Sequence, residues 1–123
     1  MSRDLVEKAE EAAKTAYAPY SSYLVGAVVR MHDGREFAGV NVENAAYPLG
    51  VCAERAAFAR AISEGHRPGD FVVAAITASP CGGCRQWLLE MGVERVVFRS
   101  GDRVVTMTPD ELLPASFGSS ELP

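Results

Sequence analysis

The sequence predicts an α/β protein, a three-layer α/β/α arrangement with one mixed five-stranded sheet between helices. Its 123 residues suffice for one domain with its own core but not for two, so we expect a single domain over residues 1–123. Apolar residues make up 48% of the chain, which is typical of globular proteins. Segments with helix and strand character follow in the order α-β-β-α-β-α-β-β-α, and this order favours helices on both faces of one sheet.

The first half of the chain predicts a helix followed by a hairpin. Residues 3–16 are rich in Ala, Glu and Lys, and their apolar members form one narrow stripe, which is typical of an amphipathic helix that Pro19 would end. "YLVGAVVRM" and "FAGVNV" have strand composition, and "HDGRE" between them is typical of a hairpin turn. The predicted strands and the loop after them are residues 23–31, 37–42 and 43–50.

The second half predicts two helices separated by a buried strand. Residues 52–65 form a predicted helix that Gly65 would close. The β-branched and small apolar residues of 71–78 indicate a strand buried on both faces. Residues 81–92 form the next helix, with Trp87 expected in the core. Two short strands, a helical turn and an irregular tail follow, at residues 94–100, 103–108, 108–113 and 114–123.

Charge and hydropathy exclude two classes of partner. The formal charge is −4, and the 12 Lys and Arg residues are scattered without a basic run, which argues against a polynucleotide ligand. No apolar run approaches the roughly 20 residues of a membrane helix, and the N-terminus lacks the apolar stretch of a signal peptide, so we expect a cytoplasmic protein without a membrane partner. An odd count of three cysteines then favours metal binding or catalysis over disulfides.

The three cysteines stand at two predicted helix starts. Cys81 and Cys84 form a C-x-x-C pair, and Cys52 begins the preceding helix. The N-terminus of a helix favours a thiolate over a thiol. Three thiolates provide the protein ligands of an open, catalytic zinc site, whereas a structural site needs four. His32 and His66 fall in predicted turns and are poor candidates for a fourth ligand, so we expect one catalytic Zn²⁺ per chain.

Two charged residues follow Cys52. Glu54 could reach the open zinc position without binding the metal, and there it could take a proton from water and return it to a substrate. Three thiolates on Zn²⁺ leave a negative centre, so a guanidinium from Arg55 near a sulfur would draw off charge. Gln86, two residues after Cys84, is either a helix-surface residue or a second such support.

Other functions remain open at this stage. Cys81 and Cys84 could be the redox pair of a small thiol-redox protein, which would leave Cys52 and Glu54 without a role. A zinc-binding interaction module without catalysis is another alternative. Glu54 could also be an ordinary solvated residue, as most glutamates are.

Four stretches together resemble the small zinc-dependent cytidine deaminase family over nearly the whole chain. They are "AYAPYSSYLVGA" from Ala16, "GVNVENAAYPLGVCAERAA" from Gly39, "SPCGGCRQWLLE" from Ser79 and "LLPASFG" from Leu112. C-x-x-C alone is a weak signal, but C-A-E-R together with P-C-x-x-C-R-Q in one small chain is a specific one. The resemblance implies a cytidine deaminase-like fold, and hydrolysis of cytidine and 2′-deoxycytidine to uridine and 2′-deoxyuridine with release of ammonia, in pyrimidine salvage.

The resemblance also implies roles for individual residues. Cys52, Cys81 and Cys84 would bind zinc, a zinc-bound hydroxide would attack C4 of the base, and Glu54 would shuttle protons. Asn41 and Glu43 would bind the ribose 3′-hydroxyl, and family members are homotetramers that share sites between subunits. The other implied substrate-binding residues, some of them reaching a neighbouring subunit's site, are Tyr23, Ala45, Tyr47, Ala53 and Phe117.

The chain departs from the family pattern in two places. Tyr23 and Leu24 stand where the family usually has Phe and Pro. The connection "TASPCGG" before the second and third cysteines is shorter than in most relatives. A changed base pocket would suit a deaminase of a modified cytosine nucleoside, such as a nucleoside antibiotic, although the intact "NVEN" stretch from Asn41 favours an unchanged sugar site.

Overall fold

The computed structural model describes residues 2–123, which form one five-stranded sheet between layers of helices. The strands are β1 (Gly26–Met31), β2 (Glu36–Val40), β3 (Phe71–Ile76), β4 (Arg95–Ser100) and β5 (Arg103–Met107). Their order is β2-β1-β3-β4-β5; β3 and β4 pair in parallel and the other neighbours are antiparallel. The sheet is therefore mixed, and the predicted fold class is confirmed.

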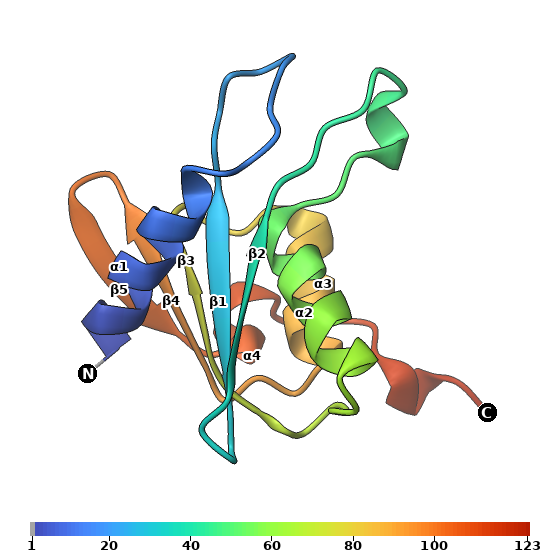
Figure 1. The fold of residues 1–123 in the computed structure, drawn as a ribbon. Helices are drawn as coiled ribbons and strands as arrows, with labels where there is room; N and C mark the ends of the chain where they lie inside the picture. The colour runs from blue at the N-terminus through green and yellow to red at the C-terminus, as the bar shows by residue number, and fades with distance from the viewer. Residues whose placement is uncertain (1) are drawn as a thin grey trace.

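The helices divide between the two faces of the sheet (Figure 1). Helix α1 (Ser2–Ala13) covers one face, and α2 (Ala53–Ser63) and α3 (Gly82–Glu90) cover the other. The short α4 (Pro109–Leu112) packs beside α3, and two 3₁₀ turns, η1 (Tyr47–Leu49) and η2 (Ser119–Glu121), lie in the loop before α2 and in the tail. Within residues 2–123 no helix is long and apolar enough to cross a lipid bilayer.

Alternating strand residues build one core on each face of the sheet. In β1, Val28 points to α1 whereas Ala27 and Val29 point to α2 and α3. This alternation is the period-2 geometry of a strand. Five of the six residues of β3 are buried, which confirms the expected strand with two buried faces.

A glycine lets α2 lie directly against the sheet. A Cβ atom at Gly39 of β2 would overlap the backbone nitrogen of Ala57 and stand 2.5 Å from the carbonyl oxygen of Ala53. Only glycine permits so close an approach of helix and strand backbones. The first turn of α2, which carries Glu54, is thereby fixed relative to β2.

Some expectations differ from the structure. Helix α1 ends at Ala13 instead of residue 16, and β1 begins at Gly26 instead of residue 23. The strand starts late because the side chain of Asn41 takes the N–H of Val25 and the carbonyl oxygen of Tyr23. The backbone N–H of Asn41 also donates to the carbonyl oxygen of Val25. Trp87 is 39% exposed, so its assignment to the core was wrong: one ring face stacks on Phe58 and the remainder lies at the surface.

Candidate metal centre and active site

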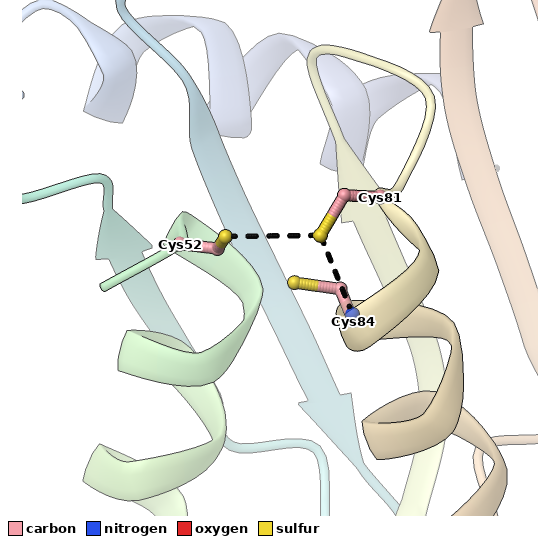
Figure 2. Close-up of side chains that lie close together, drawn as sticks. All are labelled: Cys52, Cys81 and Cys84. Carbon is pink, nitrogen blue, oxygen red and sulfur yellow. Dashed lines mark hydrogen bonds between the residues drawn. The ribbon is translucent and has the colours of Figure 1, made fainter. Parts of the chain in front are cut away.

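Three thiols meet where two helices begin. Cys52 is the N-cap of α2, Cys81 is the N-cap of α3, and Cys84 lies in the first turn of α3. Their sulfur atoms all lie within 4.8 Å of one another, and Figure 2 shows the three side chains converging. The Cys52 and Cys81 sulfurs are 3.9 Å apart. Tetrahedral ligands at about 2.3 Å from zinc stand about 3.8 Å apart, so the Cys52–Cys81 distance matches that of two zinc ligands.

The chemistry of the donor set also calls for a cation. The backbone N–H of Cys84 donates to the Cys81 sulfur over 3.5 Å. Burial raises the pKa of the Cys81 thiol. Hydrogen bonds from Cys84, Cys52 and Gly83 together outweigh burial, so the pKa lies below its usual value. Burial, together with the negative charges of Glu54, Cys52 and Cys81, raises the pKa of the Cys84 thiol. Three thiolates beside a carboxylate repel one another, and a bound Zn²⁺ removes that repulsion.

Glu54 is buried beside the thiols. It is 4% exposed and lies in the first turn of α2. Burial raises the pKa of its carboxyl group, and hydrogen bonds and the charge of Arg55 only partly oppose this. Glutamate is almost never fully buried without a partner or a function. A buried carboxyl with a raised pKa next to a metal centre can both accept and return a proton.

Arg55 lies against the ligand Cys52. Its Nη2 is 3.6 Å from the Cys52 sulfur and 3.2 Å from the carbonyl oxygen of Gly50, to which it donates. The guanidinium therefore adds positive charge beside one thiolate, in the arrangement expected from the spacing of the two residues.

A cavity of about 250 Å³ opens beside the thiols. In this cavity, several residues that were expected to contact the substrate lie together with the metal ligands and Glu54. Its lining residues are Tyr23, Val25, Asn41, Cys52, Ala53, Glu54, Ile76, Ala78, Ser79 and Cys81. We call this space the zinc-side cavity.

Asn41 and Glu43 make contacts that the sequence did not indicate. The Asn41 amide donates to the carbonyl oxygen of Tyr23 over 2.9 Å and accepts from the Val25 N–H over 2.8 Å. Glu43 accepts from the backbone N–H groups of Tyr20 and Ser21 over 2.9 and 3.1 Å, and from the Ser21 hydroxyl. Both side chains therefore hold the segment that carries Tyr23 at the cavity.

Glu43 borders a second cavity, of about 320 Å³, and not the zinc-side cavity. Its carboxylate shares that lining with Tyr20, Ser21 and Tyr47. The donating Ser21 hydroxyl holds the pKa of Glu43 below its usual value despite some desolvation, so the group is a carboxylate near neutral pH. Ser21 was not among the residues expected at the site. Its place in "APYSSY", part of one stretch that resembles the family, was the available signal.

The remaining expected residues lie away from the zinc-side cavity. Ala45 is exposed, Tyr47 is 75% exposed and Phe117 is 61% exposed. The Gln86 side chain donates to the carbonyl oxygen of Phe117 over 2.9 Å, so it holds the C-terminal segment against α3.

Three thiols without a fourth ligand in their cluster, within the described residues, next to a buried carboxyl and a cavity, define a catalytic zinc enzyme of the α/β class. Residues 1–100 match the profile of the cytidine and deoxycytidylate deaminase zinc-binding region. The chain belongs to the cytidine deaminase family.

Individual relatives agree with this assignment over nearly the full length. The chain is 40% identical to a cytidine deaminase of Halalkalibacterium halodurans, with 96% of this chain and 95% of the relative covered. A crystal structure of cytidine deaminase from Burkholderia pseudomallei superimposes with a TM-score of 0.88 at 41% identity, covering 95% of this chain and 99% of that one. The cytidine deaminase structure from Mycobacterium tuberculosis gives 0.81 at 37% identity, with coverage of 94% and 96%.

Proposed function

We propose that the protein catalyses the hydrolytic deamination of cytidine and 2′-deoxycytidine to uridine and 2′-deoxyuridine, with release of ammonia, in pyrimidine salvage. The observation that carries this proposal is the position of Glu54. It is buried, it shares a cavity with Cys52 and Cys81, and its carboxyl pKa is raised by burial. Relatives that are about 40% identical over their whole length bear the name cytidine deaminase.

The chain's own residues divide the work. Cys52, Cys81 and Cys84 would hold a zinc ion, which would supply an activated water as the nucleophile. Glu54 would accept the first proton of the attacking water and give it to the ring nitrogen N3. It would then accept the second proton, from the hydroxyl added at C4, and pass it to the departing amine, which leaves as ammonia while C4 becomes a carbonyl. Arg55 offsets the negative charge of the thiolates. The apolar lining of the cavity excludes competing water from the base.

In this proposal the sugar side combines Tyr23 and Asn41, which line the zinc-side cavity, with Glu43, which lines the second cavity. Asn41 lines the zinc-side cavity, where it also fixes the backbone around Tyr23. The Glu43 carboxylate accepts three bonds from the 20–21 segment and retains capacity for one more donor, such as a ribose hydroxyl. A site built around a substrate hydroxyl rejects analogues that lack it.

The same geometry favours free nucleosides over nucleotides. No Lys or Arg is among the lining residues of either cavity, and the Glu43 carboxylate would repel a phosphate. We expect turnover of cytidine and 2′-deoxycytidine, and a kcat/KM at least about 100-fold lower for their 5′-monophosphates, a difference of about 2.7 kcal/mol. Absorbance assays with the four compounds test this, and equal use of a monophosphate would contradict it.

We also propose a homotetramer in which neighbouring chains complete each site. Several large apolar side chains stand exposed on the surface of the single chain, where a neighbouring subunit could cover them. They include Tyr17, Tyr20, Tyr47, Leu49 and Phe117. In a tetramer, Ala45, Tyr47 and Phe117 would reach a neighbouring site. Analytical ultracentrifugation measures the assembly, and a monomer at assay concentration would contradict the proposal.

A further inference from the structure

The connection between β3 and α3 forms one wall of the zinc-side cavity. Strand β3 ends at Ile76, and Cys81 caps α3. Between them, Ala78 and Ser79 line the cavity. This connection, residues 77–81, therefore carries both a zinc ligand and part of the surface that a bound base would meet.

One end of the wall is fixed to the sheet. The N–H of Thr77 donates to the carbonyl oxygen of Gly26 over 3.0 Å, and the Thr77 hydroxyl accepts from the Gly26 N–H over 3.1 Å. These two bonds continue the pairing of β3 with β1 by one residue, so the wall leaves the sheet at a defined point.

The other end is held by Arg85 of α3. Its Nε donates to the carbonyl oxygen of Pro80 over 2.9 Å, and its Nη2 donates to the hydroxyl of Ser79 over 3.2 Å. Its Nη1 donates to the carbonyl oxygen of Leu112 over 3.0 Å. A guanidinium is planar with donors in a fixed fork, so the three bonds also fix the relative positions of their acceptors.

Leu112 gives Arg85 a firm anchor. It is 4% exposed and belongs to the core between the sheet and α2 and α3. It ends α4, whose start is fixed by a reciprocal capping pair of Thr108 and Glu111. Arg85 thus connects the wall of the cavity to a part of the core that lies outside the metal centre.

We infer that Arg85 is a positioning residue that sets the width of the base pocket by holding Ser79 and Pro80 in place. The inference rests on the proposed function. In that mechanism C4 lies at the metal and N3 faces Glu54 on α2. C5 flanks C4 on the side opposite N3, so it faces away from α2 and toward the wall. A substituent on C5 therefore tests how much space residues 77–81 leave beside the base.

The test compares Arg85→Lys with the parent protein. Lysine keeps the charge but cannot make three bonds in a fixed fork. With zinc content unchanged, we expect kcat for cytidine to fall, and the ratio of kcat/KM for 5-methylcytidine to that for cytidine to rise about fivefold, the effect of one lost hydrogen bond. Ser79→Ala, which removes one of the three acceptors, should shift the ratio in the same direction by less.

A matched control and a second readout separate this role from general damage. Arg67→Lys changes an arginine that also donates to two backbone carbonyl oxygens, at the opposite end of α2 from Cys52, and should leave the ratio unchanged. Amide hydrogen exchange should accelerate in residues 77–81 of Arg85→Lys while β1 and β3 stay protected.

Two outcomes would overturn the inference. The first is an Arg85→Lys protein with full zinc, a parental substrate ratio and parental exchange in residues 77–81. The second is an Arg85→Lys protein that loses zinc but keeps the parental ratio of kcat/KM for 5-methylcytidine to that for cytidine. That result would mean that Arg85 supports the metal ligands and not the wall. If the parent protein does not convert cytidine, the proposed function is wrong. Hydrogen exchange in residues 77–81 would still test whether Arg85 holds the wall in place.

Discussion

Glu54→Gln is expected to lose about 10²- to 10⁴-fold in kcat while keeping zinc and nucleoside binding. Glutamine has nearly the shape of glutamate but cannot carry the proton, and Glu54 is the buried carboxyl in the zinc-side cavity. Since Glu54 is not one of the three clustered thiol ligands, its replacement leaves the metal centre intact. Steady-state rates, zinc per chain and nucleoside affinity are measured on the same preparation.

The matched control for this variant is Glu64→Gln, at the other end of α2. Glu64 is exposed and pairs with Arg35 over 3.2 Å, so its replacement should leave both zinc content and rate unchanged. A Glu54→Gln protein with parental turnover would remove Glu54 from the proton transfers.

Cys84→Ala should have the second large effect, on both zinc and stability. Cys84 is the buried member of the trio, at 1% exposure, and two thiols hold zinc far more weakly than three. Zinc that binds only the folded chain stabilises it by about 2.7 kcal/mol when present at 100 times its dissociation constant. Losing it should lower the melting temperature by roughly 10 °C. Elemental analysis and thermal unfolding with and without added zinc measure both effects.

Zinc removal from the parent protein provides the comparison. The chelated parent should melt near the temperature of Cys84→Ala, and added zinc should restore the parent but not the variant. If Cys84→Ala held a full complement of zinc, Cys84 would not be a ligand.

Part of the metal centre was predictable from local signals. Cys81 and Cys84 are three residues apart at one helix start, and Cys52 and Glu54 share another. The convergence of the two helix starts was expected from the number of thiolates that a zinc site needs and from the family resemblance. The strands were predictable from local signals too: strand composition, the hairpin turn and the apolar run of residues 71–78 identify strands without knowledge of their partners. The order of the strands within the sheet was not predicted, because it depends on pairing between segments that are distant in sequence.

The supporting contacts were not predictable, because they join segments distant in sequence. The side chain of Arg85 donates to the carbonyl oxygen of Leu112, and the hydroxyl of Ser21 donates to the carboxylate of Glu43. No periodic pattern in the sequence indicates either pair. The late start of β1 has the same origin, because the Asn41 side chain forms hydrogen bonds with the backbone of Tyr23 and Val25. Trp87 is a large apolar residue of the kind found in cores, yet the packing of α3 leaves 39% of it exposed.

The most direct test of the account measures cytidine absorbance and zinc content on one sample of the purified protein. We expect loss of the cytidine band, with about one zinc per chain and an activity that rises and falls with zinc occupancy. Zinc without turnover of cytidine would contradict the proposed substrate and direct attention to the wall at residues 77–81. Turnover that persists without zinc, or a protein that binds none, would contradict the metal centre itself.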